Sequence, residues 1–267
     1  MASDMGARPS VPWQFVVSSS KAVCGEQAAL KGAQLIREAI SKRGSCNIIL
    51  ATGSSQLDML EHLVTSDGVD WNKVTCFHLD EYIGLSDDHP ASFVGYLRER
   101  FLNKLPTKPA AFHFINGLSK PEVTCKQLGN VIKQHQIDVA FIGIGENGHL
   151  AFNDPPADFE TEEPYISVQL AESCRKQQLG EGWFATLEEV PQQAITMSIH
   201  QIMAAQHLIV TVPEKRKAKA VHDTIMGEVD SKVPATILQR HAHCYLYLDI
   251  DSTRGTRYQV SMEKTMD

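Results

Sequence analysis

The chain has 267 residues, 43% of them hydrophobic, and a formal net charge of −7 at pH 7. This length suits a single α/β domain, and the acidic balance without a basic run argues against nucleic-acid binding. No stretch approaches the roughly 20 apolar residues of a membrane span, so we expect no membrane association.

Residues 1–12 have no apolar core like that of a signal peptide, and we expect them to form a loose arm. The six cysteines occur without CxxC pairs and without the spacing of zinc ligands. Free thiols in apolar segments are typical of a reducing compartment. We therefore expect a cytoplasmic protein that holds no metal.

The first predicted elements are a helix over 19–43, where apolar residues recur at helical spacing, and a buried strand over 47–51. The polar turn 52–55, TGSS, follows this strand, and helical spacing resumes over 57–63. Such a turn directs backbone N–H groups and hydroxyls to one point at a helix start, where an anion is favoured. It is either a phosphate-binding loop or a simple helix N-cap by one of its serines.

The next strand is predicted over 74–79, and it ends in the adjacent carboxylates Asp80 and Glu81. At such a strand end one carboxylate can face a cleft while the other forms a pair or caps a helix. The alternative is the start of an exposed loop. Helical spacing then predicts a helix over 92–102.

A short strand over 112–115 and a weak helix over 121–134 lead to the most informative stretch. Its apolar run 137–142 is typical of a strand buried on both faces, and the glycine-rich turn 143–148 follows. His149 stands directly after this turn, and open α/β sheets place their sites at such strand ends. The alternative is a plain glycine turn with a surface histidine.

The turn 143–148 also reads as G-x-G-x-x-G, the pattern of a dinucleotide-binding turn. That pattern requires a long helix opening at the third glycine. Pro155 follows Gly148 too closely for an ordinary helix. We therefore expect no nucleotide cofactor.

Residues 157–190 are polar and contain few apolar positions, which suggests an active-site lid. Strands are then predicted over 194–199, 207–212 and 244–248, with a helix after Pro213. About seven strands alternating with helices indicate a mostly parallel, doubly wound α/β sheet. We expect one domain over 1–267, with 157–190 as its lid.

Four segments occur in an order that resembles the glucosamine-6-phosphate deaminase family, also called glucosamine-6-phosphate isomerases. They are ATGSS at 51–55, FHLDEYIGL at 77–85, IGIGENGHLAFNDP at 142–155, and Lys217 in its helix. The resemblance covers roughly 45–250. It implies a modified Rossmann-like sheet, shared with 6-phosphogluconolactonases and some sugar-phosphate sensor domains.

The resemblance also implies an activity, the conversion of glucosamine 6-phosphate to fructose 6-phosphate and ammonia. This requires ring opening, proton transfer from C2 to C1 and loss of the amine, without a cofactor. A lactonase on the same fold and a non-catalytic sugar-phosphate sensor are the alternatives. The DEY and FNDP stretches favour the deaminase over the lactonase, and retention of Asp80 and His149 favours an enzyme over a sensor.

By this resemblance, Asp80 is the base at C2 and His149 opens the sugar ring. The catalytic set implied is Asp80, Asn147, His149 and Asp154. The substrate-binding set implied is Thr52, Gly53, Ser54, Ser55, Glu81, Gly145, Arg175 and Lys217. Within it, Glu81 has a structural or supporting role, and Arg175 is the nearest candidate for the arginine of the family's lid.

The chain departs from the family pattern beside the histidine, where the best-known members carry an Asp and a Glu. Here these positions are Asn147 and Asp154. Asn147 carries no charge, so it can orient His149 but cannot stabilise the imidazolium as a carboxylate would. We expect effects on the rate, the pH optimum and the choice of amino sugar. The expected partner is a phosphorylated amino sugar, with a homo-oligomer possible and no allosteric activator.

Overall fold

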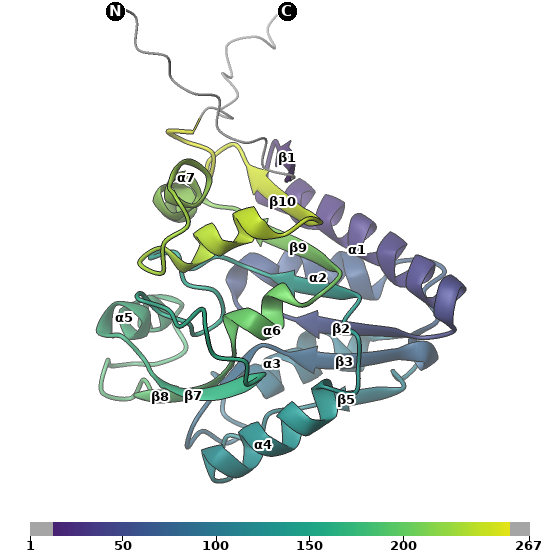
Figure 1. Ribbon diagram of the computed structural model, residues 1–267, viewed down its shortest axis with the longest axis horizontal. Coiled ribbons are helices and arrows are strands. Elements are labelled where there is room, and N and C mark those ends of the chain that lie inside the picture. Colours follow the sequence, from purple (N-terminus) through teal and green to yellow (C-terminus); the bar gives the residue numbers. More distant parts are fainter. Residues whose placement is uncertain (1–12, 257–267) are drawn as a thin grey trace, which may run out of the picture.

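Seven parallel strands form the main sheet of the computed structural model, which describes residues 13–256 (Figure 1). Their order is β1-β10-β9-β6-β2-β3-β5, and every neighbouring pair is parallel. The strands are β1 (Gln14–Ser18), β2 (Cys46–Leu50), β3 (Val74–His78), β5 (Ala111–His113), β6 (Val139–Ile142), β9 (His207–Val212) and β10 (Cys244–Asp249). The predicted parallel α/β sheet is confirmed.

Helices cover both faces of this sheet, as expected for a doubly wound fold (Figure 1). One apolar cluster joins it to α1 (Lys21–Arg43), α2 (Leu57–Val64) and α3 (Phe93–Arg100). The other joins it to α4 (Pro121–Ile132), α6 (Ile199–Met203), α7 (Ala218–Met226) and η5 (Pro234–Arg240). Neighbouring strand residues alternate between the two clusters: Ile209 packs in the first, and Leu208 and Val210 in the second.

The longest helix, α1, shows how the sequence sets these contacts. Ser20 caps its start by accepting a hydrogen bond from the N–H of Val23, and Gly44 ends it in the left-handed region with φ of 80°. In its middle, a Cβ on Gly32 would lie 2.2 Å from the Phe141 ring. The glycine therefore allows α1 to lie directly on β6, the strand that carries the central turn.

A second, antiparallel sheet of three strands lies at one end of the main sheet, in the order β4-β8-β7. Its strands are β4 (Asp80–Tyr82), β8 (Gln193–Met197) and β7 (Tyr165–Gln169). The strand predicted over 194–199 therefore does not belong to the parallel sheet, where β1 takes the seventh place instead. Its apolar run is buried, but periodicity does not report which neighbour a strand pairs with.

The segment 157–190 is less irregular than its polar composition suggests, because it contains β7 and helix α5 (Glu172–Gly180). A third apolar cluster lies beneath α5 and joins Tyr82, Phe152, Cys174, Phe184 and other buried residues. The segment is therefore anchored to β8 by one strand, while α5 extends beyond it.

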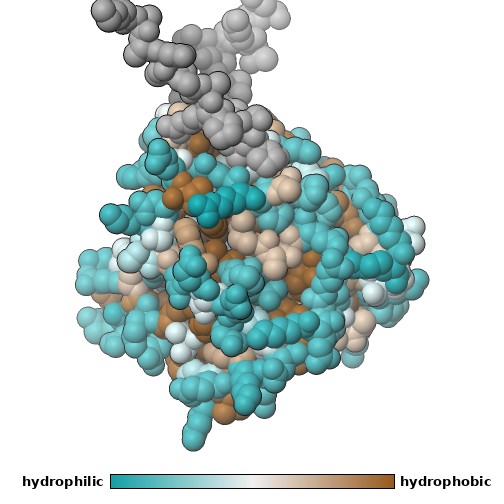
Figure 2. Space-filling model, in the orientation of Figure 1, coloured by the Kyte–Doolittle hydropathy of each residue, from teal (hydrophilic) through white to brown (hydrophobic). Residues whose placement is uncertain are grey.

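The remaining short helices are η1 (Ser54–Gln56), η2 (Trp71–Lys73), η3 (Leu102–Lys104) and η4 (Lys215–Lys217). Hydrophilic residues dominate the face shown in Figure 2, with apolar residues visible between them. Within residues 13–256, no helix has the length and apolar character needed to cross a membrane. The arm expected over 1–12 lies outside the described residues.

Candidate active site

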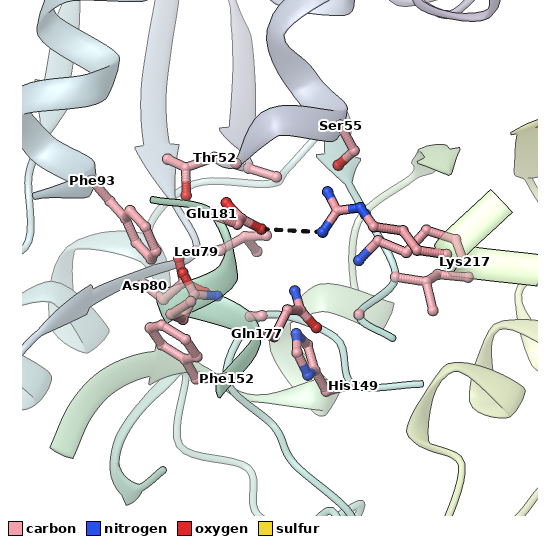
Figure 3. Close-up of a pocket in the computed structure, with 18 residues that line it drawn as sticks. Thr52, Ser55, Leu79, Asp80, Phe93, His149, Phe152, Gln177, Glu181 and Lys217 are labelled. Atoms are coloured by element: carbon pink, nitrogen blue, oxygen red, sulfur yellow. Dashed lines mark ion pairs between the residues drawn. The ribbon is translucent and has the colours of Figure 1, made fainter. Parts of the chain in front are cut away.

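The carboxyl ends of four neighbouring strands, β3, β2, β6 and β9, surround one cavity (Figure 3). Parallel strands bring their carboxyl ends to one edge of the sheet, which is where open α/β folds bind ligands. The cavity is lined by residues that follow each strand: Leu79 and Asp80 after β3, Ala51, Thr52, Gly53 and Ser55 after β2, Gly143, Ile144, Gly145 and His149 after β6, and Arg216 and Lys217 after β9. Four of the predicted segments therefore meet at one place.

Asp80 lies on one side of this cavity, opposite Lys217 (Figure 3). The residue is 6% exposed, and β4 holds it in antiparallel pairing with Thr196 of β8. Burial, and then the neighbouring charge of Glu81, raise the pKa of Asp80 well above its ordinary value. A carboxyl group so shifted can exchange a proton closer to neutral pH, as a general base requires.

Glu81 faces away from the cavity and does not line it. Its carboxylate accepts hydrogen bonds from the backbone N–H groups of Tyr82, Phe93 and Val94 and from the Ser92 hydroxyl, at 2.7 to 3.2 Å. Three of these groups, from Ser92, Phe93 and Val94, belong to the start of α3, so Glu81 fixes that helix beside the site. A substrate contact by Glu81 is not supported, and the supporting role is favoured. Both carboxylates are buried, so the exposed-loop alternative is excluded.

His149 lies at the tip of β6 with 7% exposure, which excludes the alternative of a surface histidine. Its Nδ1 lies 3.3 Å from Oδ1 of Asp154. The Asn147 amide donates to that oxygen at 3.2 Å, and Asn147 Oδ1 accepts from the backbone N–H of His149 at 3.1 Å. Asn147 and Asp154 thus hold the imidazole without lining the cavity themselves.

The charge of Asp154 is supported from several directions. Burial raises the pKa of its carboxyl group, but the hydrogen bond and charge of His149, together with the Ala171 N–H and the Asn147 amide, bring the net shift below the ordinary value. Ala171 is the N-cap residue of α5. Asp154 therefore joins the histidine to the start of the helix over the site.

The glycines of the central turn serve close packing rather than nucleotide binding. A Cβ on Gly145 would lie 2.2 Å from Cε1 and Nε2 of His149, so the imidazole sits directly on this glycine. Gly148 has φ of 85° and turns the chain. No helix follows it before Pro155 in the described chain, which agrees with the exclusion of a dinucleotide turn.

Contacts with α3 and β9 hold the turn after β2 in place. Tyr96 donates its hydroxyl to the Gly53 carbonyl at 3.0 Å, and the Gln56 amide reaches the Thr211 carbonyl of β9 at 3.2 Å. Neither serine of the turn caps η1 or α2, so the simple N-cap alternative is not observed. Ser54 instead accepts a hydrogen bond from Arg216 at 2.7 Å and lies just outside the cavity lining.

Lys217 faces the same turn and is 4% exposed. Burial, and then the charge of Arg216, lower the pKa of its ammonium group to about 8. A buried ammonium at the end of an anion-binding loop is well placed to pair with a phosphate. It is the residue that the sequence resemblance indicated for that role.

Helix α5 and the residue after it contribute three cavity-lining side chains, Gln177, Gln178 and Glu181. Gln177 accepts the backbone N–H of Glu146 at 3.0 Å, and Gln178 accepts the Tyr82 hydroxyl at 2.9 Å. Sequence analysis missed these residues and also Arg216. The only sequence signal for them was the basic cluster 215–217 and the polar composition of 157–190.

Arg175, the candidate lid arginine, does not reach the cavity. Its guanidinium donates to the backbone carbonyls of Leu187 and Val190. It therefore ties α5 to the chain that returns to β8. These contacts do not support its assignment as a substrate-binding residue. The position of Arg175 in the sequence did not indicate which way its side of the helix faces.

Three possible metal ligands also meet here: His149 Nδ1, an Asp154 oxygen and Cys174 Sγ lie within 4.8 Å of one another. Asp154 already accepts hydrogen bonds from Asn147 and Ala171. Burial, and then the charges of Asp154 and Asp80, raise the pKa of the Cys174 thiol. Within this group we interpret Asp154 as the support of His149, because its Oδ1 lies 3.3 Å from Nδ1.

A buried carboxylate, an oriented histidine and a buried lysine beside a polar turn are groups suited to acid–base chemistry on a small ligand. Comparison with known proteins places the chain more narrowly. It belongs to the family described as glucosamine-6-phosphate isomerases/6-phosphogluconolactonase, whose model matches residues 19–246.

Individual relatives agree with this placement. The chain is 35% identical over 229 residues to a glucosamine-6-phosphate deaminase of Thermoanaerobacter pseudethanolicus, covering 84% of this chain and 89% of that one. It is 37% identical over 225 residues to that of Exiguobacterium sibiricum, covering 84% and 87%.

Among solved structures, a monomeric glucosamine-6-phosphate deaminase superposes with a TM-score of 0.83 at 26% identity, covering 90% of this chain and 98% of that one. A 6-phosphogluconolactonase of Trypanosoma brucei shares the fold, with a TM-score of 0.73 at 16% identity, covering 91% and 98%.

Proposed function

We propose that this protein converts glucosamine 6-phosphate and water to fructose 6-phosphate and ammonia. The observation that carries this proposal is the common cavity of Asp80, His149, the 52–55 turn and Lys217. In this cavity Asp80 is a base for the C2 proton and His149 is a group for ring opening. The 52–55 turn with Lys217 is a separate anion site. The relatives at 35% and 37% identity are named for this activity.

The phosphate is held by the 52–55 turn and Lys217, and the sugar extends from there toward Asp80. His149 exchanges a proton with the ring oxygen, which opens the ring and leaves an aldehyde at C1. The Asp154 carboxylate, 3.3 Å from Nδ1, supports the positive imidazolium in this step.

Asp80 then removes the C2 proton of the open-chain sugar, which the neighbouring carbonyl has made acidic. The C2–H electrons form a C1=C2 double bond, and the carbonyl electrons pass to the C1 oxygen, which takes back the proton that it released on ring opening. Asp80 then returns its own proton to C1 of this enolamine. This leaves an iminium ion at C2, to which water adds. Loss of ammonia then gives the ketone. No electrons are gained or lost, so the sequence needs no redox cofactor.

The test measures ammonia release from glucosamine 6-phosphate, with fructose 6-phosphate assayed in parallel. We expect equal amounts of both products, and Asp80→Asn should reduce turnover by about 10²–10⁴. Asp67→Asn is the matched control, because Asp67 is an exposed carboxylate in the turn after α2. Absence of both products, with hydrolysis of 6-phosphogluconolactone instead, would assign the chain to the lactonase activity.

We also propose that residues 157–190 act as a lid of a single domain. Support comes from α5, which contributes Gln177 and Gln178 to the cavity and contacts Asp154 through the Ala171 N–H at 3.0 Å. Addition of glucosamine 6-phosphate should alter protease cleavage between 170 and 192. Identical cleavage with and without the sugar phosphate would reject the lid.

A cytoplasmic location and a homo-oligomer remain our proposals as well. All six cysteines are free, and five are buried, which suits a reducing compartment. Four large apolar side chains are exposed in the described chain: Leu30, Leu118, Val123 and Trp183. Light scattering of the purified protein determines the assembly, and a monomer mass at all concentrations would reject the oligomer.

A further inference from the structure

Arg216 occupies the centre of a charged network at the phosphate end of the cavity. Its guanidinium donates to the Ser54 hydroxyl of the anion-binding turn at 2.7 Å. Three carboxylates surround it, Glu214 at 2.7 Å, Glu146 at 3.0 Å and Glu181 at 3.9 Å. The side chain is 31% exposed and lines the cavity beside Lys217.

Glu181 stands out among these carboxylates because it enters the anion-binding region from the opposite wall. It is the C-cap residue of α5, and its side chain is 10% exposed. Its Oε2 lies 3.9 Å from the position that a Cβ on Gly53 would take. Figure 3 shows its carboxylate directed across the cavity toward Arg216.

The other two carboxylates are held differently. Glu214 pairs with Lys21 at 2.6 Å, and its backbone N–H donates to the Asp249 carboxylate. Glu146 is 42% exposed and therefore partly solvated. The Glu181 side chain is only 10% exposed, and within residues 13–256 Arg216 is its one salt-bridge partner. At 3.9 Å this pair is long, so Glu181 is the carboxylate that a competing anion displaces most readily.

Charge balance leads to the same conclusion. A sugar phosphate brings a charge of about −1.5 to −2 near neutral pH. Placed on the 52–55 turn, it would lie beside the Glu181 carboxylate, and two anions at that distance repel each other. Arg216 is the cation that both anions would share, because its guanidinium contacts Ser54 of the turn and lies 3.9 Å from Glu181.

We propose that Arg216 binds the phosphate of the substrate, and that Glu181 is its internal counter-ion, which exchanges with that phosphate as the partner of Arg216. The inference rests on the proposed function, because it takes a sugar phosphate as the ligand. Arg175 does not reach the cavity, and Arg216 supplies the guanidinium group instead. It comes from η4 and not from the lid. Because Glu181 follows α5 directly, phosphate binding releases the carboxyl end of the lid helix.

The test measures binding of inorganic phosphate to the full chain by titration calorimetry at constant ionic strength. Glu181→Gln removes the competing charge, so phosphate should bind roughly three- to ten-fold more tightly. Arg216→Gln should weaken binding by about ten-fold or more. In the Arg216→Gln background, Glu181→Gln should change affinity by less than about two-fold, because the shared partner is gone.

Matched controls lie on the same two elements. Glu172→Gln removes an exposed carboxylate at the other end of α5, and Lys215→Gln removes the exposed cation next to Arg216. Both should leave phosphate affinity within about two-fold of the original protein. Glu181→Ala serves as a second variant, and melting temperatures identify any variant that fails to fold.

Two results would overturn the inference. One is a Glu181→Gln variant that folds but binds phosphate no more tightly. The other is a gain in affinity that persists undiminished in the Arg216→Gln background. Phosphate affinity is measured independently of turnover. If Glu181 and Arg216 are coupled in phosphate binding but no ammonia is released, only the proposed function is rejected. If ammonia is released but the two residues are not coupled, only this inference is rejected.

Discussion

Nδ1 of His149 lies 3.3 Å from Oδ1 of Asp154, and the Asn147 amide donates to the same carboxylate oxygen. The Asp154 carboxylate beside the histidine is therefore held in place by the uncharged Asn147 side chain. The other carboxylate oxygen accepts the Ala171 N–H at the start of α5. One carboxylate thus orients the imidazole and anchors the helix over the site.

Replacement of this carboxylate should damage catalysis more than folding. In Asp154→Asn the imidazolium loses its charged partner, and we expect kcat/KM to fall by about 10²-fold or more. Steady-state kinetics and thermal melting measure the two effects. Glu160→Gln, an exposed carboxylate of the same connection, is the control and should retain activity. A comparable loss in both variants would contradict the assignment.

Asp80 should lower the stability of the protein at neutral pH. The carboxyl group of the unfolded chain titrates near its ordinary value of 3.8, and the pKa of Asp80 in the folded protein is well above it. Between these values the folded state holds a proton that the unfolded chain has released, so the stability present at lower pH is lost as pH rises.

Asp80→Asn should therefore raise the melting temperature at pH 7.5 by roughly 2–4 °C, a gain of about 1 kcal/mol in unfolding free energy. At pH 4 the gain should shrink, because Asp80 is then protonated. Scanning calorimetry at the two pH values measures the difference. If Asp80→Asn is inactive and also melts at a lower temperature than the original protein at pH 7.5, burial of the Asp80 carboxylate does not lower the unfolding free energy.

Lys217 should make phosphate binding depend on pH. Its pKa of about 8 means that the ammonium form is present below this value and lost above it. KM for a phosphorylated substrate should therefore rise by about ten-fold per pH unit above the pKa of about 8 of the free protein, until the pH reaches the higher pKa of the complex. Lys217→Met should bind weakly at all pH values and lack this dependence. A KM that is flat from pH 7 to 10 would exclude Lys217 from the anion site.

Gly145 provides the most local test of the histidine's position. A Cβ there would lie 2.2 Å from the imidazole, so Gly145→Ala must displace His149. We expect kcat to fall by about 10²-fold, as for other small displacements of catalytic groups. Gly129→Ala in α4, where the nearest atom is 3.6 Å away, should keep full activity. Normal kinetics in Gly145→Ala would show that His149 does not act from this position.

Strand patterns alone indicated three of the segments that line the cavity, each with an alternative left open. The apolar run before Gly143 predicted a buried strand, and the 52–55 and 80–81 positions followed two others. Because parallel strands end at one edge, residues distant in sequence were expected to meet there, and the structure brings them together. The resemblance then indicated roles for Asp80, His149 and Lys217.

Residues that depend on tertiary contacts were missed for a physical reason. Arg216 stands in the basic cluster 215–217, and only the fold brings Ser54 and Glu181 to it. Glu181 lies in a segment whose helix shows little apolar pattern. β1 was missed because it is a half-buried edge strand, and the pairing of β8 with β4 depends on a connection of more than a hundred residues.

The connection between β7 and β8 has an evolutionary consequence. His149 after β6 and Lys217 after β9 follow strands of the main sheet, and Asp80 begins β4, which comes directly after β3 and pairs with β8. Gln177 and Glu181 lie instead in the connection between β7 and β8. Substitutions or insertions in that connection can therefore change which sugar phosphate is admitted without moving the base. In such a fold the catalytic residues can stay the same between relatives while the residues that select the substrate change.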